Sequence, residues 1–193
     1  TPKQGKAIML ACDEILNGRL HGQFITDLIQ GGGGIGMNMN ANEIIANRAN
    51  EMLGGTKGNY EYVHPLDHVN FGQSSNDDIQ TAGKIAAIRM SKKLLVELKK
   101  LQNALNDKKE EYAEILRIGR THLKPASPMT FYQAFEAYSF TIQKDIKRIE
   151  NALSGMYDLN MGANLIGSGL KTDTKYAKKV VFYISKYTGE DFK

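Results

Sequence analysis

Apolar side chains recur every three or four residues over two long stretches of this chain, and this spacing limits the possible folds more than any other feature. One stripe comprises Phe135, Tyr138, Ile142, Ile146, Ile149, Leu153 and Met156. The other comprises Leu94, Leu98, Leu101, Leu105, Tyr112 and Leu116. Such a period is that of an α-helix with one apolar face. The sequence therefore predicts two long helices that need partner helices, as in a helical bundle.

Glycine-rich breaks divide the remainder into shorter helices. One helix is predicted over residues 3–17, ending at Asn17-Gly18, and another from Asn40 through Met52. The run Gly31 to Gly34 excludes regular helix or strand. Because no stretch shows sustained strand alternation, an all-α fold is predicted. We expect an N-terminal helical domain over residues 1–80 and part of a central helical bundle over 81–193. A two-stranded coiled coil fits less well, since the charged flanking positions are irregular.

Composition narrows the class of protein. Hydrophobic residues make up 41% and charged residues 24%, as in an ordinary globular protein. The net charge of +4 raises the possibility of nucleic-acid binding, but basic and acidic residues alternate along the helices, so no nucleic-acid partner is expected. No apolar run is long enough to cross a bilayer. The single cysteine, Cys12, favours a reducing compartment, and a cytoplasmic location is expected.

Three breaks in the helical pattern are rich in hydroxyl and amide side chains. They are the segments Gly31–Asn40, Gln73–Asp77 and Gly119–Leu123. Each has a structural explanation: the second resembles a helix N-cap, Gly119 could end one helix, and Thr121 could cap the next. His122 alone is more often a histidine with structural partners than a catalytic one. Spacing and composition alone thus predict a helical bundle with polar loops.

These three segments, in this order and with this spacing, resemble the signatures of the fumarase/aspartase branch of the aspartase/fumarase superfamily. The matching runs are Asn38–Glu43 with Ala46-Asn47, then Gln73–Asp77, then Gly119–Leu123. Further similarity extends through Tyr157–Ala163 and Gly167–Leu170, so the resemblance covers essentially the whole chain. Membership implies lyases that interconvert fumarate with an amino- or hydroxy-dicarboxylate.

The resemblance implies a specific chemistry. A proton leaves the carbon beside one carboxylate, and the doubly charged intermediate needs preorganised hydrogen-bond donors. The implied substrate-binding residues are Ser74, Ser75, Asn76, Thr121, His122 and Asn40. Thr121 and His122 are also the catalytic candidates, because they would orient or protonate the departing group and histidine titrates near neutrality. Neither a metal ion nor a cofactor is expected.

The segment Asp158–Ala163 is more similar to the aspartase side of the branch than to the fumarase side. Elimination of ammonia from L-aspartate is therefore the first expectation. The alternatives are a class II fumarase, a lyase for a related amino-dicarboxylate, or a non-catalytic paralogue that retains only the scaffold. Family membership also implies a homotetramer whose active sites combine signature regions from three different subunits.

Several residues depart from the family pattern, and Ile35, Gly36 and Ala134 favour the non-catalytic alternative. Ile35 and Gly36 occupy positions where the family has a hydroxyl pair, and losing such a donor can lower the rate about a hundredfold. Leu66 replaces an asparagine of the secondary fumarase site, and Ala134 replaces a family glutamate. The family's base-bearing Gly-Ser-Ser loop does not occur before Lys193. The chain, which also lacks an initiator methionine, is therefore expected to be a fragment that cannot catalyse the elimination alone.

Overall fold

The computed structural model describes residues 1–193, which form two compact units. The first unit consists of Thr1–Gly83 and Leu159–Lys193, and the second of Lys84–Asp158. Helix α3 (Ser75–Glu111) begins in the first unit and continues into the second. None of the helices combines the length and apolar character that a membrane span requires. The all-α prediction is confirmed, and one two-stranded sheet is added to it.

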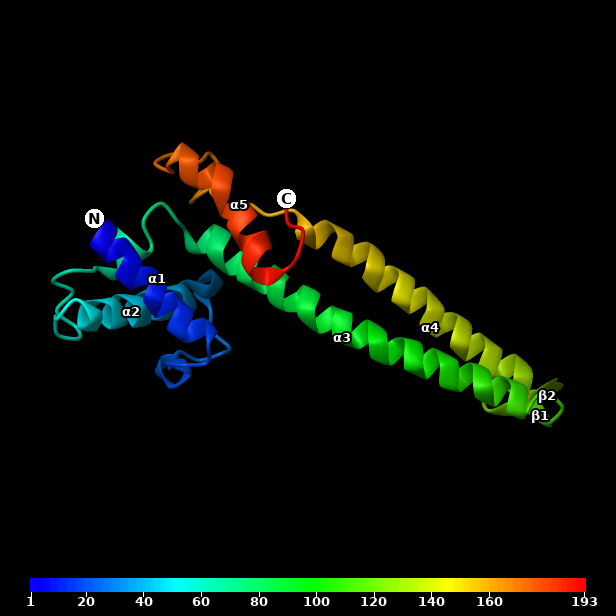
Figure 1. Ribbon diagram of the computed structural model, residues 1–193. Coiled ribbons are helices and arrows are strands. Elements are labelled where there is room, and N and C mark those ends of the chain that lie inside the picture. Colours follow the sequence, from blue (N-terminus) through cyan, green and yellow to red (C-terminus); the bar gives the residue numbers. More distant parts are fainter. The chain divides into compact units, whose positions relative to one another are not determined.

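In the first unit, α1 (Pro2–Leu16) packs on α2 (Ile35–Met52), as Figure 1 shows. Thr1 and Gln4 form a capping box at the start of α1. The helix ends at Asn17, followed by Gly18 with φ +84°, as the sequence predicts. Small residues allow the two helices to approach closely around a core of Ala7, Ala46, Ala49 and Val63.

Polar contacts join α2 to α1 and to the segment that follows α2. The Arg48 guanidinium on α2 donates to both carboxylate oxygens of Glu14 on α1, at 2.7 and 2.8 Å. This pairing lowers the pKa of Glu14. The fully buried Asn50 donates to the Val63 carbonyl at 2.7 Å and accepts from the Val63 N–H at 3.2 Å. Asn50 therefore fixes the segment that follows α2 against the helix.

Helix α2 begins five residues earlier than predicted, at Ile35 rather than Asn40. Gly32, Gly33 and Gly34 form a short 3-10 turn in which all three have positive φ, so the glycine run is irregular, as predicted. The turn changes the direction of the chain directly before α2, so Ile35, Gly36 and Met37 are already helical. The prediction was wrong because it took the polar run that begins at Asn40 for the start of the helix.

The 159–193 part of the first unit ends in α5 (Thr174–Thr188). Asp173 caps this helix by accepting from the N–H groups of Lys175 and Tyr176, at 2.7 and 3.1 Å. Gly189, with φ +74°, ends it in the left-handed conformation.

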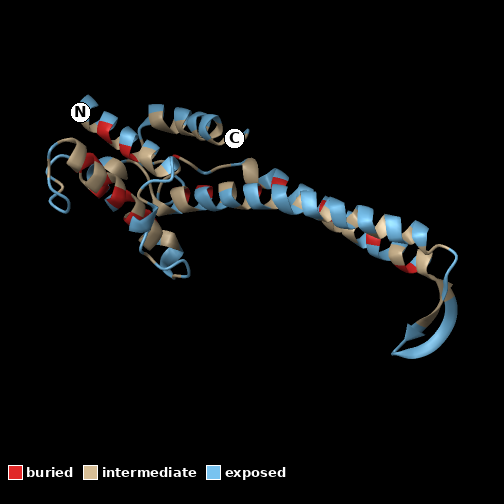
Figure 2. Cartoon of the chain, turned by 60° about the horizontal axis from the view of Figure 1, so that its bottom comes forward, coloured by how far each residue is buried: buried red, intermediate tan, exposed pale blue.

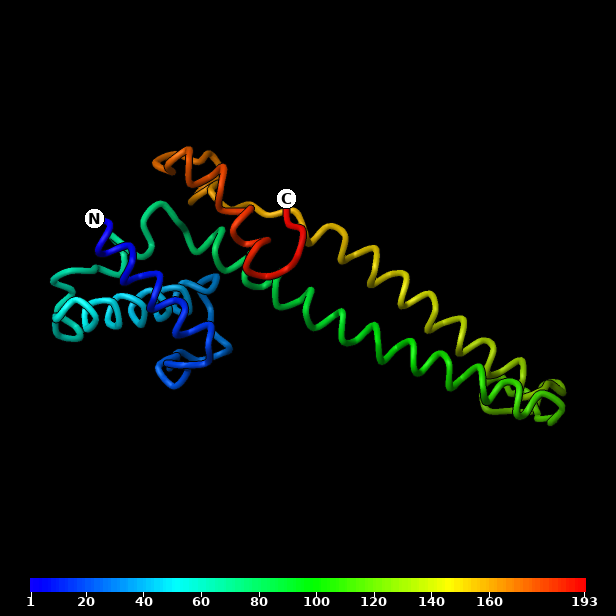
Figure 3. Tube along the Cα trace, in the orientation of Figure 1, coloured from blue at the N-terminus to red at the C-terminus, as the bar shows by residue number.

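The second unit contains the main part of α3 and the antiparallel helix α4 (Phe131–Ser154), which lie side by side in Figures 1 and 3. A hairpin of β1 (Leu116–Thr121) and β2 (Lys124–Thr130) joins them. The prediction that the helical stripe continues to Leu116 was wrong, because α3 ends at Glu111. Pro125 and Pro128 exclude a helix from the second arm, and the β-branched Ile115 and Ile118 favour extended backbone.

The unit buries only part of the predicted apolar stripes. Ile146 and Leu153 are buried, whereas Leu94, Leu101 and Tyr138 are exposed. Figure 2 shows the same contrast, with buried residues frequent on α2 and sparse along α3 and α4. The Ser139 hydroxyl donates to Asn106 Oδ1 at 2.6 Å across the pair. The predicted division into domains 1–80 and 81–193 stays a prediction.

Candidate functional site

The predicted substrate-binding residues Ser74, Ser75 and Asn76 lie together where α3 begins. The Ser74 hydroxyl accepts from the Asn76 N–H at 3.2 Å, and Asp77 Oδ1 accepts from the Ser74 N–H at 2.8 Å. The segment therefore does cap the helix, as its simpler explanation requires. A helix N-terminus also favours anions, because its free N–H groups and the helix dipole are positive there. Both properties make this segment suitable for a carboxylate.

Three asparagine side chains lie behind this segment. Asn38 Nδ2 donates to Ser75 Oγ at 2.8 Å and to Asn70 Oδ1 at 3.2 Å. Asn42 Nδ2 donates to the side-chain oxygens of Asn38 and Asn70, at 3.2 and 3.1 Å. Asn38 is 8% exposed and Asn42 is also buried. Buried amides are stable only when their hydrogen bonds are made, so this group holds Ser75 in one position.

Asp77 connects the start of α3 with the loop at 160–165. It is fully buried, and its Oδ2 accepts from the N–H groups of Gly162 and Asn164, at 3.2 and 3.1 Å. Gly162 has φ +85°, and a Cβ atom there would lie 3.0 Å from Ala177 Cβ, so both conformation and space require glycine. The same loop contacts Asn76, whose Nδ2 donates to the Leu165 carbonyl at 2.8 Å.

A second carboxyl group, Asp78, lies next to Asp77. Burial, and then the charge of Asp77, raise the pKa of Asp78 to about 7. The Gln73 amide nitrogen donates to both oxygens of Asp78, at 3.2 Å each, in the orientation that satisfies both side chains. Burial also raises the pKa of Tyr176 on α5, whose hydroxyl is buried without a hydrogen-bond partner. An uncharged Asp78 is therefore a stable form near neutral pH.

Thr121 and His122 lie at the hairpin turn in the second unit. Thr121 pairs with Lys124, and the two residues between them, His122 and Leu123, have φ +45° and +65°. Positive φ at both central residues is the type I′ geometry that usually requires asparagine or glycine. The suggested role of Thr121 as a helix cap was wrong, because Thr130 caps α4 through a capping box with Gln133.

Asn40 lies away from the Ser74–Asn76 segment. It is two residues from Asn38 on α2, so its side chain points to a nearly opposite face of the helix. Its Oδ1 accepts from the Ile25 N–H at 3.0 Å, and its Nδ2 donates to the Gln23 carbonyl at 3.2 Å. Asn40 therefore holds the 20–30 loop, beside a small hollow of about 210 Å³. Its role in substrate binding stays a prediction.

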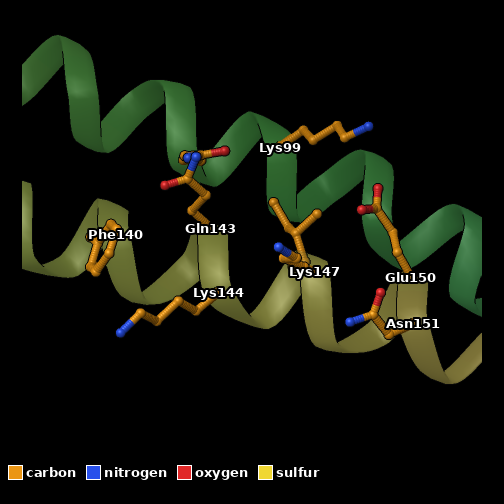
Figure 4. Close-up of a pocket in the computed structure, with 9 residues that line it drawn as sticks. Lys99, Phe140, Gln143, Lys144, Lys147, Glu150 and Asn151 are labelled. Carbon is orange, nitrogen blue, oxygen red and sulfur yellow. The ribbon is translucent and has the colours of Figure 1, made fainter.

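A hollow of about 730 Å³ contains none of the predicted site residues. Figure 4 shows it as an open groove between α3 and α4, with three lysine side chains at its walls. They are Lys99, Lys144 and Lys147. Ile146 of the predicted α4 stripe lines the groove, and so does Phe140. The groove belongs to the helix-packing surface, and its lining includes amide side chains but no hydroxyl side chain.

The structure thus brings Ser74, Ser75 and Asn76 together, and it places Thr121 and His122 in a different unit of the chain. Sequence reasoning gave no role to Asn70 and included Asp77 only as part of a helix N-cap segment, although both hold the first group in place. The run of amides between Asn38 and Asn50 was a usable signal for the buried network. The similarity at residues 157–163 also signalled the loop that contacts Asn76, without showing where it would lie.

The structure is a helical scaffold whose breaks present hydroxyl and amide donors, with one such segment at the start of its longest helix. A family model described as Lyase matches residues 1–193. The chain therefore belongs to this lyase family, within the aspartase/fumarase superfamily.

Similar proteins include enzymes from both sides of the branch. Aspartate ammonia-lyase of Bacillus subtilis (strain 168) is 45% identical over 185 residues, which cover 96% of this chain and 39% of that protein. Mitochondrial fumarate hydratase of Mus musculus is 44% identical over 192 residues, covering 99% of this chain and 38% of that protein. The chain thus spans about two fifths of the length of these relatives.

Among solved structures, the fold matches a fumarate lyase:delta crystallin from Brucella melitensis bound to cobalt. The TM-score is 0.90 at 38% identity, and the match covers 100% of this chain and 42% of that one. At this identity the likeness extends beyond the fold to the sequence, so it supports the family assignment independently.

Proposed function

We propose that the full-length protein eliminates ammonia from L-aspartate to give fumarate. The observation that carries this proposal is the 45% identity to an aspartate ammonia-lyase across 96% of the chain. The hydroxyl and amide groups that such a reaction needs are present at Ser74–Asn76 and at Thr121-His122. The printed sequence alone includes too little of the relatives' length for activity to be assigned to it.

The proposed roles follow from the chemistry of the side chains. Ser74, Ser75 and Asn76 would bind one carboxylate and the leaving-group side of the substrate, where the positive end of α3 adds to their hydrogen bonds. Thr121 and His122 would bind the other carboxylate and assist the departing ammonia. Donors held in place by the protein stabilise the doubly charged intermediate without reorganisation.

The proposal includes a homotetramer with composite active sites. Two observations support it: Ser74–Asn76 and Thr121-His122 belong to different units of this chain, and apolar side chains on α3 and α4 stay exposed. Leu94, Leu101 and Phe140 are examples of such side chains. Apolar contact with other copies would remove this surface from water. The cytoplasmic location stays a prediction, since the relatives include a protein named mitochondrial.

Class II fumarate hydratase is the second candidate, because fumarate hydratases are nearly as similar, at 43–44% identity. The deciding experiment uses the purified full-length protein and follows the ultraviolet absorbance of fumarate with L-aspartate and with malate separately. Fumarate from aspartate but not from malate is the expected result. Turnover of malate but not aspartate would contradict the aspartate proposal and establish the second candidate.

Ile35 favours a third candidate, a non-catalytic paralogue. Its side chain is 57% exposed at the start of α2, where the family pattern has a hydroxyl group. If the wild type forms fumarate from neither substrate, the variant Ile35→Thr tests the cause. Activity that appears in this variant would show that the missing hydroxyl alone inactivates the protein. Continued inactivity in both would support a scaffold that has lost its chemistry.

A further inference from the structure

The buried Asn38 and Asn42 and the half-buried Asn70 behind Ser75 form a relay with a fixed direction. This amide relay consists of Asn38 and Asn42 on α2 and Asn70 in the segment before α3. Each side-chain amide has a donor end and an acceptor end, so every bond in the relay points one way. The direction decides whether the Ser75 hydroxyl donates or accepts.

The relay starts at a backbone carbonyl, which can only accept. Asn70 turns its Nδ2 toward the Gln73 carbonyl, at 3.4 Å, and therefore presents its Oδ1 to α2. Two N–H groups converge on that oxygen, from Asn38 at 3.2 Å and Asn42 at 3.1 Å. The backbone thus sets the orientation of Asn70, and Asn70 sets the orientation of its two neighbours.

Asn38 is held from both sides. Its Oδ1 accepts from Asn42 Nδ2 at 3.2 Å, while its Nδ2 faces Asn70 Oδ1. A reversed Asn38 amide would place nitrogen against nitrogen on one side and oxygen against oxygen on the other. The second hydrogen of Nδ2 then reaches Ser75 Oγ at 2.8 Å. Ser75 accepts this bond, so its own hydroxyl hydrogen points away from the relay.

We propose that Asn38 is a positioning residue that holds Ser75 as a hydrogen-bond donor to the ligand. An oriented hydroxyl of this kind suits an acceptor such as a carboxylate oxygen and disfavours a donor in the same place. The proposal rests on the proposed function in one respect, the dicarboxylate nature of the ligand. The direction of the relay follows from the hydrogen bonds alone.

The variant Asn38→Asp tests the relay because it keeps the shape and removes the donor. An aspartate at this position accepts the Ser75 hydrogen and withdraws it from the ligand. In the full-length protein, we expect kcat/KM for the active substrate to fall roughly 10- to 100-fold, the range for a hydrogen bond to a charged group. Ser75→Ala should cause a similar loss, and the double variant should lose no more than the larger single loss.

A loss in the double variant equal to the product of the single losses would overturn the proposal. It would show that Asn38 acts on the ligand independently of Ser75, for example through the added charge. The matched control is Asn47→Asp on the same helix, because Asn47 Oδ1 accepts from the Gly58 N–H at 2.8 Å and an aspartate retains that bond. The control should stay within about twofold of wild type. If Asn38→Asp does not fold, Asn38→Leu removes the relay without adding charge and should still lower kcat/KM.

A neutron structure of the unliganded full-length protein locates the deuterium atoms of the relay, and this measurement does not depend on catalytic activity. Deuterium on Asn38 Nδ2 pointing at Ser75 Oγ is the expected result. A Ser75 deuterium pointing at Asn38 would overturn the proposal even in an active enzyme. Conversely, a wild type that converts neither aspartate nor malate would defeat the proposed function, while the deuterium positions would still decide the relay.

Discussion

At the scale of single residues, backbone strain at the hairpin turn coincides with the candidate catalytic histidine. His122 and Leu123 both have positive φ, a region that costs an ordinary residue about 1 kcal/mol or more. The 93% exposed Leu123 side chain gains nothing from burial in the chain to offset this strain. Such strain is found preferentially at functional sites, where the surrounding structure holds it in place. The turn therefore fixes His122 in one geometry at the expense of stability.

Replacing Leu123 by asparagine should release part of this strain. Asparagine tolerates left-handed backbone, and the substitution removes no buried contact. We expect the free energy of unfolding of the full-length protein to rise by about 0.5–1 kcal/mol, measured by urea denaturation. The matched control is Leu116→Asn in β1, which has ordinary backbone and is also exposed, and which should not stabilise. An equal gain in both variants would mean that polarity, rather than φ, is responsible.

Asp78 should make stability depend on pH. Its pKa of about 7 in the folded chain exceeds the value of about 3.9 expected when unfolded. The folded state therefore binds the proton more tightly. The stabilisation from this proton is complete below pH 4 and is lost as the pH rises through 7.

The variant Asp78→Asn removes this titration and keeps a neutral side chain of the same shape. Relative to wild type, its free energy of unfolding should improve between pH 4 and 8, with a net change on the order of 1–2 kcal/mol once partial solvent screening is included. Denaturation at several pH values measures it. A constant difference between the two proteins across this range would show that Asp78 is ionised in the fold.

At the scale of elements, the sequence predicted helices well where apolar spacing was long and regular, and poorly where chain direction changed. The helix predicted over residues 3–17 occurs at Pro2–Leu16, and the Phe135–Leu153 stripe lies within α4. The 116–130 hairpin was missed because its turn lacks the usual Asn-Gly signal and uses His122-Leu123 instead. Backbone strain of this kind depends on tertiary contacts, which the turn propensities of single residues do not include.

The cap of α4 gives a direct test of the revised boundary. Thr130 Oγ1 accepts from the Gln133 N–H at 3.3 Å, and Gln133 Oε1 accepts from the Thr130 N–H at 3.0 Å. Thr130→Ala should lower the free energy of unfolding by about 1 kcal/mol, because it leaves a helix N–H without its partner. Thr121→Ala serves as the control and should have the smaller effect in the same denaturation series. A larger loss of free energy of unfolding in Thr121→Ala than in Thr130→Ala would indicate that Thr121 caps the helix.

At the scale of the whole molecule, the candidate site could be predicted in its parts but not in its arrangement. Similarity of short motifs pointed to Ser74–Asn76, yet the asparagines that orient Ser75 and the carboxylate of Asp77 emerged only from long-range contacts. Asp77 and Gly162 are 85 residues apart in sequence. Hydrogen-bond direction in a buried network depends on all of its members together, so no single motif contains it.

The exposed apolar stripe leads to the last prediction, which concerns assembly. Leu101 lies on the α3 stripe and is 46% exposed, so a second copy that covers it would bury apolar surface. Leu101→Lys would place a charge in that contact, and we expect the full-length protein to shift from a tetramer to smaller species in light scattering at micromolar concentration. Asn103→Lys, an exposed position on a different face of the same helix, adds the same charge and should leave the mass unchanged. A tetramer that persists in Leu101→Lys, or a wild type that is monomeric, would contradict assembly through this stripe.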